Sequence, residues 1–514
     1  MNGAQTILHT AAQAGIKLCF TNLGTTELPL ALAFDAQRAV KPVLGLFEGV
    51  CTGAADGYGR MLDRPALTLL HLGPGLANGL ANLHNAKRAR APIVNIIGEH
   101  MTGHIALDAP LTMDIEALAG TVSGWCKTTR SPHELAGDMV AAINAARFGQ
   151  IATLIVPNDY QLAQVPDETI AAFDFAFDPM GERAIGTAAQ FLQRARKGAL
   201  LIGGRGLRTE GLHAAARIKA RTGCDLLSDY LPGIMARGVG LPEITRIPYF
   251  PEQALELLAR YDAILICGTQ EPVSFFGYPG IPGRLLTEEQ PRMAITTPRQ
   301  DPIEALQCVA EALGCPREVS PQVTAARRCR DIPQGKLTAE KACQGLAALQ
   351  PEGAIIVDEG VSSAFAYYAL SHGLPPHAML LNSGGAIGYG LPCAIGAAMA
   401  CPDRPVLNLQ ADGSAMYTVQ ALWTQARQRL NVTTLVCANR SYGILKMEVA
   451  RAGIGALGPN LASVLDLDDP HLDWVKMAQA MGVAAVSVAT GEQLAAAVRQ
   501  ALDEPGPHLI EMVL

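Results

Sequence analysis

The chain has 514 residues, of which 49% are hydrophobic, and its net charge is -7 at pH 7. This composition excludes an intrinsically disordered chain, because it supplies enough apolar side chains for large buried cores. The acidic balance, without any basic block, argues against nucleic acid as a partner.

Cysteine usage and the absence of targeting patterns indicate the compartment. The 12 cysteines are scattered without a CxxC pair, and most lie inside apolar runs. They are typical of core residues, so we expect neither a zinc site nor a disulfide framework, and a reducing cytoplasm is the expected location. The sequence shows no signal-peptide pattern and no apolar run suited to a membrane span.

Short apolar runs alternate with alanine-rich helical stretches along the whole chain. Because these runs lack polar alternation, they predict strands that are buried on both faces, in parallel sheets covered by helices. Polar, proline-bearing seams near residues 158–184 and 315–336 divide the pattern. The prediction is an α/β protein with three doubly wound domains, over residues 1–170, 185–318 and 336–514.

In the first predicted domain, two apolar strands end at titratable side chains. The strand over residues 43–47 ends at Glu48, and a later strand ends at His71 with a helix expected to begin at Asn78. Such residues are usually a helix N-terminal acid and a structural histidine. Taken alone, they therefore do not establish a catalytic site.

The middle predicted domain carries one glycine-rich turn, Gly203-Gly204-Arg205-Gly206, after an apolar run. Such a turn could contact a nucleotide phosphate, but the pattern alone is weak. We find no convincing G-x-G-x-x-G turn with an acid about 20 residues later, which argues against a nicotinamide-dependent dehydrogenase.

In the third predicted domain, one apolar run stops at Asp412 and the next stops at Asn439, with a helix predicted over residues 415–429. In an open parallel sheet, ligands bind beyond the carboxyl ends of the strands. Gly413 lets the backbone approach a ligand, and Ser414 can cap the helix. A carboxylate, an amide oxygen and a nearby carbonyl suit a partly hydrated Mg²⁺, so the stretch predicts a metal-bridged diphosphate.

This stretch resembles the thiamine-diphosphate motif, in which Gly-Asp-Gly is followed further on by Asn-Asn. Ala411 and Ala438 replace the leading Gly and the first Asn, and neither is expected to be a ligand. The resemblance implies that Asp412, the Asn439 side chain and the Ser441 carbonyl hold Mg²⁺, which in turn holds the diphosphate.

The segment around Glu48 resembles the catalytic-glutamate segment of the same family. The resemblance implies that Glu48 hydrogen-bonds the aminopyrimidine ring, after which the cofactor loses its C2 proton. Residues 380–397 resemble another family segment, with Ile387 where a bulky side chain supports the bent cofactor. The cofactor contacts implied by the resemblance are Asn78, Ser362, Gly385, Ala386, Ile387, Asp412, Gly413, Ser414, Asn439, Ser441, Tyr442, Gly443 and Ile444.

The benzoylformate decarboxylase branch of the family offers the nearest match in motifs. Its Gly-Ser-Asn-Glu-Leu-Pro stretch corresponds to residues 24–29, with Thr25 at the substrate-binding serine, and His71 falls on its catalytic histidine. The resemblance implies that Thr25 binds the substrate carboxylate and that His71 transfers protons.

One feature of that branch is missing. Phe276 or Gly277 stands where its second catalytic histidine is expected, and His100 or His104 could replace that residue. Each of these two histidines, taken singly, is more often a surface loop residue.

The resemblance predicts a non-oxidative 2-oxo acid decarboxylase that acts through an enamine. An acetolactate-synthase-like carboligase, which joins the enamine to a second carbonyl compound, is the alternative. Residues Asp108-Ala109 match the synthases, but Pro110-Leu111 departs from them. A non-catalytic regulatory subunit is a more distant alternative, which the combined presence of Glu48, Asp412 and Asn439 disfavours.

The resemblance also implies an assembly. Residues 1–170 would bind the pyrimidine, residues 185–318 would form a central domain, and residues 336–514 would bind the diphosphate and Mg²⁺. Each site would lie between the first domain of one subunit and the third of another, in a dimer or tetramer. The expected partner is a small 2-oxo acid, without nucleic acid or membrane, and a flavin site at the Gly203 turn is expected to be vestigial or empty.

Overall fold

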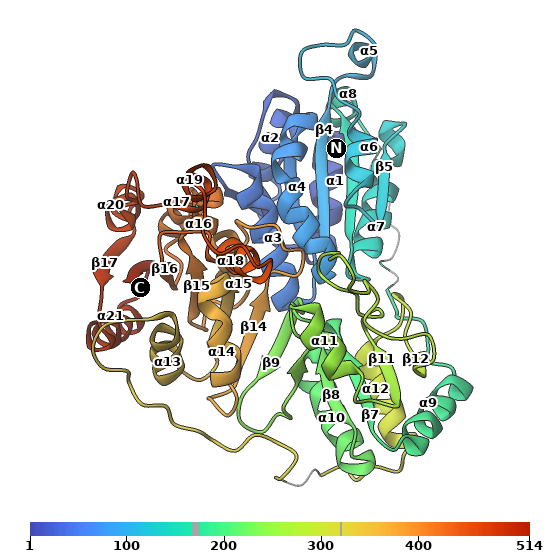
Figure 1. Cartoon of the computed structure of the whole chain (residues 1–514). Coiled ribbons are helices and arrows are strands. Elements are labelled where there is room, and N and C mark those ends of the chain that lie inside the picture. Colours follow the sequence, from blue (N-terminus) through green and yellow to red (C-terminus); the bar gives the residue numbers. More distant parts are fainter. Residues whose placement is uncertain (167–172, 174, 319–320) are drawn as a thin grey trace. The chain divides into compact units, whose positions relative to one another are not determined.

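A computed structural model describes residues 1–166, 173, 175–318 and 321–514 of the chain. Helices and strands alternate through mainly parallel sheets (Figure 1). Most of the apolar runs are buried on both faces, as in β6 (Ile151–Pro157), where all seven residues are buried. The predicted α/β class is therefore confirmed, because strands of this kind need helices on both sides of the sheet.

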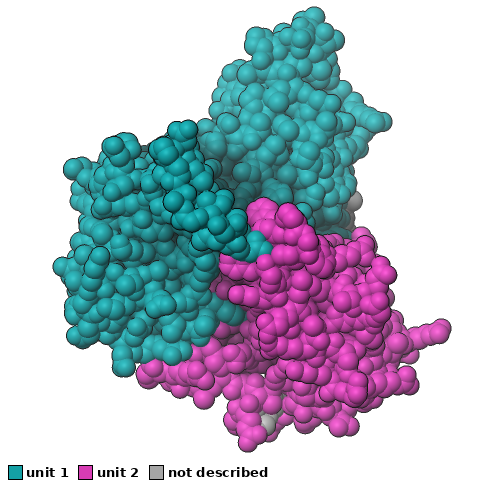
Figure 2. Space-filling model, viewed as in Figure 1, with its two compact units in different colours: residues 1–175, 330–370, 382–514 teal, residues 176–329, 371–381 magenta. Residues whose placement is uncertain are grey.

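The chain divides into two compact units, which Figure 2 shows in different colours. The first unit comprises residues 1–175, 330–370 and 382–514, and it contains two of the parallel sheets. The second unit comprises residues 176–329 and 371–381.

The first sheet of unit 1 has the strand order β2-β1-β3-β4-β6-β5, with every pair parallel. Its strands are joined by helices, as parallel strands require. Its remaining strands are β1 (Leu18–Thr21), β2 (Lys41–Leu44), β3 (Ala66–His71), β4 (Ile93–Glu99) and β5 (Trp125–Thr128), and its main helices are α1 (Gly3–Gln13), α2 (Leu28–Ala36), α3 (Glu48–Leu62), α4 (Leu72–Ala89) and α7 (Leu135–Ala146).

The other sheet of unit 1 has the parallel order β17-β18-β16-β15-β13. Ala411 pairs with Cys437, so Asp412 and Asn439 follow neighbouring strands at one edge of the sheet. The elements of this sheet are β13 (Ile355–Glu359), β15 (Val406–Ala411), β16 (Val432–Ala438), β17 (Ala484–Val488) and β18 (His508–Val513), with α13 (Ala339–Leu349), α15 (Gly390–Ala400), α20 (Trp474–Ala480) and α21 (Gly491–Asp503) among its helices.

Helices α3 and α15 join the two halves of unit 1 through a close contact. A Cβ on Gly396 would lie 1.9 Å from the Ala54 carbonyl oxygen, so only glycine permits this approach. Beside the contact, the fully buried Asp56 accepts a hydrogen bond from Arg60 Nε at 2.7 Å, and Arg60 also donates to the Tyr389 hydroxyl at 3.1 Å. Removing one partner of such a buried pair is strongly destabilising, so the pair fixes how the two helices pack.

Unit 2 contains a five-stranded parallel sheet of order β10-β8-β7-β11-β12 and an antiparallel pair, β9 with β14. Its elements are β7 (Gly198–Ile202), β8 (Asp225–Ser228), β9 (Ile234–Arg237), β10 (Thr245–Arg246), β11 (Ala263–Cys267), β12 (Arg292–Ala294), β14 (His377–Leu381), α9 (Glu182–Arg194), α10 (Thr209–Thr222), α11 (Pro251–Leu258) and α12 (Pro302–Ala312).

Several predicted boundaries differ from those observed. β2 ends at Leu44, and α4 begins at Leu72, so Asn78 lies nearly two turns inside the helix. Proline is tolerated in a first turn, which explains why Pro74 does not delay that helix. The helix predicted over residues 415–429 is broken into α16 (Asp412–Ala415), a 3₁₀ turn and α17 (Ala421–Gln428).

Among the described residues, every helix is too short or too polar to span a bilayer. The 18 residues of α4, for example, include several polar side chains.

Candidate active site

Asp412 and Asn439 meet at the carboxyl edge of their sheet. Asp412 is 2% exposed, and its carboxylate accepts the Gly413 N–H at 2.8 Å and the Arg440 N–H at 2.6 Å. Burial raises the pKa of Asp412, and these two N–H groups partly offset that rise. Asn439 Oδ1 accepts the Ser441 N–H at 3.0 Å. The carboxylate therefore keeps acceptor capacity for a cation, since an ionised carboxylate has about four lone-pair sites.

Glycines let the backbone close around this edge. A Cβ on Gly413 would lie 2.7 Å from the Tyr442 ring, and a Cβ on Gly443 would lie 2.8 Å from Ser362 Oγ. Burial raises the pKa of the Tyr442 hydroxyl. Ile444, in α18 (Gly443–Arg451), is half-buried. These side chains gather beside one carboxylate and one amide, a donor set that fits a magnesium-bound diphosphate.

A second buried acid, Glu359, lies at the end of the neighbouring strand β13. It is 3% exposed and accepts the N–H groups of Gly388, Tyr389 and Gly390 at 2.8–3.0 Å. Gln410 donates a hydrogen bond to the Glu359 carboxylate at 2.9 Å. Burial raises the pKa of Glu359. Glu359 thus fixes the loop that carries Gly385, Ala386 and Ile387.

The sequence analysis singled out Ser362 near this strand end and missed Glu359. The apolar residues 355–357 that lead to this acid are a signal that could have found it. The glycine-rich segment 384–390 that it binds gives a second signal. Ser414, also predicted at the site, donates to the Ala411 carbonyl at 3.1 Å and accepts from Gln410 at 2.7 Å.

Glu48 begins α3 and is 9% exposed. Its Oε2 accepts a hydrogen bond from Asn78 Nδ2 at 3.0 Å, so α4 orients the carboxylate. Two residues that are 30 positions apart are thereby brought together, one at the start of α3 and the other in the second turn of α4.

His71 ends β3, as predicted, and is held by a carboxylate that the sequence reasoning did not single out. Its Nδ1 lies 2.8 Å from Glu27 Oε2, and Glu27 is fully buried. Thr26 Oγ1 donates to Glu27 at 2.5 Å and lies 3.2 Å from His71 Nδ1, whereas Thr25 is exposed. The arrangement fixes the imidazole through Nδ1 and leaves Nε2 without a hydrogen bond inside the described ranges.

Three residues close to the candidate groups have a left-handed backbone conformation. Leu72, Val361 and Arg440 have φ values of 51°, 47° and 54°. Non-glycine residues in this left-handed region cost roughly 1–3 kcal/mol each and are common at ligand-binding sites. Each of the three lies one or two residues beyond the end of a strand, at β3, β13 and β16 (Val432–Ala438).

Known proteins that are similar to this chain show which family it belongs to. The model of the thiamine pyrophosphate enzyme N-terminal TPP binding domain matches residues 1–118, and that of the C-terminal TPP binding domain matches residues 358–512. The "Putative acetolactate synthase large subunit IlvX" of Mycobacterium tuberculosis is 45% identical over 100% of this chain and 99% of its own. This chain belongs to the thiamine pyrophosphate enzyme family.

One further relative of this thiamine pyrophosphate enzyme is a decarboxylase, and a solved decarboxylase structure shares its fold. The benzoylformate decarboxylase of Pseudomonas aeruginosa is 28% identical over 97% of this chain and 96% of its own. The solved structure of a thiamine diphosphate-dependent 4-hydroxybenzoylformate decarboxylase from Rhodococcus jostii RHA1 superposes with a TM-score of 0.84. That superposition has 23% identity and covers 100% and 99% of the two chains, so it shows the shared fold.

His100 and His104 lie just beyond β4 of this thiamine pyrophosphate enzyme. Their ring centroids are 5.3 Å apart, His104 is exposed, and His100 Nε2 is buried without a partner in the described part of the chain. Glu99 precedes them, and burial raises its pKa. Their role as a replacement for the missing histidine stays a prediction.

The glycine turn of unit 2 forms a short 3₁₀ helix, Gly204–Leu207. Arg205 makes two hydrogen bonds with Asp301, at 3.1 and 3.2 Å, so its guanidinium is engaged by a carboxylate. The expectation that this thiamine pyrophosphate enzyme has a vestigial or empty flavin site stays a prediction.

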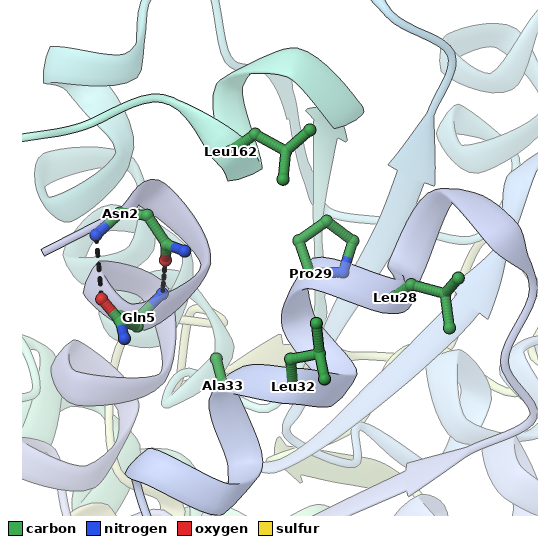
Figure 3. Close-up of a pocket in the computed structure, with 7 residues that line it drawn as sticks. All are labelled: Asn2, Gln5, Leu28, Pro29, Leu32, Ala33 and Leu162. Atoms are coloured by element: carbon green, nitrogen blue, oxygen red, sulfur yellow. Dashed lines mark hydrogen bonds between the residues drawn. The ribbon is translucent and has the colours of Figure 1, made fainter.

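A pocket of about 260 Å³ lies between α1, α2 and α8 (Asn158–Leu162), and Figure 3 shows its open, mainly apolar lining. Asn2 and Gln5 bind each other across the start of α1 as a capping box, at 2.9 and 3.0 Å. Its lining includes none of the candidate catalytic or cofactor residues, so we assign it no role. The lining residues are Asn2, Gln5, Leu28, Pro29, Leu32, Ala33 and Leu162.

Proposed function

We propose that this thiamine pyrophosphate enzyme catalyses the non-oxidative decarboxylation of a 2-oxo acid, with thiamine diphosphate and Mg²⁺ as cofactors. The observation that supports this reaction best is the carboxylate–histidine pair of Glu27 and His71. Glu27 Oε2 lies 2.8 Å from His71 Nδ1. This contact orients the imidazole so that its Nε2 can accept or donate a proton. Such a group is needed to convert the decarboxylated carbon into an aldehyde.

The residues divide the work between binding and proton transfer. Asp412, the Asn439 side chain and the Ser441 carbonyl hold Mg²⁺, and Glu48 holds a proton beside the aminopyrimidine. When bound, thiamine diphosphate supplies the electron sink that decarboxylation requires. His71 Nε2 transfers a proton at the reacting carbon.

The two threonines at the turn before α2 have different roles in this proposal. The Thr25 side chain is exposed at the turn before α2 and binds the substrate carboxylate in this proposal. Thr26 Oγ1 lies 3.2 Å from His71 Nδ1 and orients the histidine. A substrate held at this turn would present its reacting carbon to the histidine.

The proposal includes a dimer or tetramer in the cytoplasm. Each site would lie between the first domain of one subunit and the third domain of another, so that a monomer is inactive. Neither nucleic acid nor membrane takes part. Analytical ultracentrifugation with and without thiamine diphosphate and Mg²⁺ measures the assembly, and an active monomer would contradict this arrangement.

A carboligase is the second candidate, and one observation favours it. The 45% identical relative is named a putative acetolactate synthase large subunit. In that case a second carbonyl compound, and not a proton, would receive the acyl carbon. The two candidates share the cofactors and Glu48, and they differ in the product.

The experiment that tests both incubates the protein with thiamine diphosphate, Mg²⁺ and a panel of 2-oxo acids that includes pyruvate and benzoylformate, with products followed by NMR. Aldehyde and CO₂ support the decarboxylase, whereas acetolactate or another hydroxyketone identifies a carboligase. Protein without Mg²⁺ and a Glu48→Gln variant are the controls. Cofactor-induced stabilisation without turnover of any acid would overturn the substrate class.

A further inference from the structure

Helix α4 carries three asparagines on one face, and only Asn78 belongs to the candidate active site. Asn78, Asn82 and Asn85 are spaced i, i+4 and i+7, which aligns them along the helix. Asn82 is 3% exposed and Asn85 is fully buried. Burying an amide side chain is costly unless its groups are hydrogen-bonded, so the partners of this pair reveal what it does.

Asn82 bridges two segments that are far apart in the sequence. Its Nδ2 donates to the Gly49 carbonyl at 2.8 Å and to the Gly388 carbonyl at 3.2 Å. Gly49 is the neighbour of Glu48, and Gly388 is the neighbour of Ile387. Asn82 Oδ1 accepts from Asn85 Nδ2 at 2.9 Å, which orients the bridging amide.

Asn85 holds the other side of the same loop with two hydrogen bonds. Its Nδ2 donates to the Ala386 carbonyl at 2.8 Å, and its Oδ1 accepts the Ala386 N–H at 3.1 Å. A Cβ on Gly384 would lie 2.4 Å from Asn85 Oδ1, so the loop packs directly on this side chain. Both amide hydrogens of Asn85 are used, because it also binds Asn82.

The loop over residues 384–390 needs such restraints. It contains four glycines, and Gly385 and Gly388 have φ values of 74° and 94°. Glycine loses more conformational freedom on ordering than any other residue, so a free loop would pay this entropy when it binds a ligand. Glu359 holds residues 388–390 from one side, and the asparagines hold residues 386 and 388 from the other.

We infer that Asn82 and Asn85 are positioning residues that hold the Ile387 loop in register with the Glu48 end of α3 before the cofactor binds. The inference rests on the proposed function, which puts Glu48 against the cofactor of one site and Ile387 of the same chain against the cofactor of the other. In this role Asn82 and Asn85 act through the backbone of Gly49, Ala386 and Gly388.

The test uses the full-length Asn85→Asp and Asn82→Asp variants, free of metal and cofactor. Amide hydrogen exchange is measured along each variant and along the wild-type protein. The variants keep the side-chain size but lose the donor. Amide exchange over residues 384–390 should accelerate about tenfold, because a lost hydrogen bond weakens local order by about that factor. The exchange rates of strands such as β6 should stay unchanged. Asn85→Ala, which buries no charge, serves where the Asp variant does not fold.

Asn144 provides the matched control. It lies on α7, is half-buried, and its Oδ1 has no hydrogen-bond partner within the described ranges. Asn144→Asp and Asn144→Ala should leave exchange over residues 384–390 unchanged. General destabilisation would instead accelerate exchange throughout the sheets and would overturn a positioning role.

Calorimetric titration with thiamine diphosphate and Mg²⁺ gives the second readout. The Kd for the cofactor should rise about tenfold in the Asn82 and Asn85 variants and stay unchanged in the Asn144 variants. Wild-type exchange and wild-type Kd in folded variants would refute the inference. Failure of the wild-type protein to bind thiamine diphosphate would refute the proposed function instead, while the exchange data would still test the asparagine pair.

Discussion

Glu359 and Asp412 are two buried acids at the ends of neighbouring parallel strands, and they differ in their hydrogen-bond partners. Glu359 accepts from three backbone N–H groups, from Gln410 and from Asn382 at 3.2 Å. Asp412 accepts from the N–H groups of Gly413 and Arg440. Burial raises the pKa of both carboxyls.

The difference distinguishes a structural acid from a ligand-binding acid. A carboxylate that is saturated by the protein orders the groups that bind it, whereas one with unused lone pairs can bind a cation. The first sheet repeats the contrast. Glu27 binds the Gly24 N–H, Thr26 and His71, whereas Glu48 binds the side chain of Asn78.

The largest expected effect comes from an acid with few partners. Glu48→Gln should lower kcat by about 10³-fold with little change in the free energy of unfolding, because a group that holds a proton in the reaction is worth about 10²–10⁴-fold. Steady-state kinetics with saturating cofactor and chemical denaturation measure the two quantities. Glu116→Gln, an exposed glutamate of the same sheet region, is the control. Full turnover by Glu48→Gln would remove Glu48 from the mechanism.

Asp412→Asn tests the other acid with open acceptor capacity. The affinity for Mg²⁺ and thiamine diphosphate should fall at least about 10²-fold, because the change removes a charged ligand while the backbone hydrogen bonds can persist. Calorimetric titration measures the Kd. A variant that binds the metal and cofactor like wild type would show that the cation site lies elsewhere.

Glu27→Gln tests a saturated acid whose partner is a histidine. We expect kcat to fall by between about tenfold and 10²-fold with the cofactor Kd unchanged, because the amide can no longer fix His71 through Nδ1. A double-mutant cycle with His71→Gln should show strong non-additivity. Additive losses would mean that Glu27 does not act through His71.

Glu359→Gln should change the free energy of unfolding more than the catalytic activity. The free energy of unfolding should fall by about 1–3 kcal/mol, because an amide donor would face the N–H groups that Glu359 now accepts. Urea denaturation of the metal-free protein measures the change, with the exposed Glu352→Gln as control. Unchanged stability would contradict the assignment of Glu359 as a structural acid.

The smallest expected effect is a pH dependence of the metal-free protein. Since burial raises the folded-state pKa of Asp412, its contribution to stability is fully present below the unfolded pKa and is lost as the pH rises through the folded pKa. The gain in stability of metal-free Asp412→Asn over the metal-free wild-type protein should therefore be larger at about pH 8 than at about pH 4. Thermal unfolding across this range measures the difference, and a pH-independent difference would count against the burial effect.

The sequence by itself determined the α/β class and the position of several candidate residues. Apolar runs without polar alternation require parallel sheets, and the carboxyl ends of parallel strands share an edge. Asp412, Asn439 and His71 were therefore predictable as strand-end residues. The family followed from the motif around Asp412 and the segment around Glu48.

Only the tertiary structure decided which partners complete these groups. Glu27 meets His71 across 44 positions, Glu359 meets Gly388 across 29, and Asn82 meets Gly388 across 306. A local pattern predicts that a strand or helix is present, because that depends on neighbouring side chains. Whether a buried acid is saturated or open depends on donors that distant segments bring to it, and these are fixed when the helices and sheets pack.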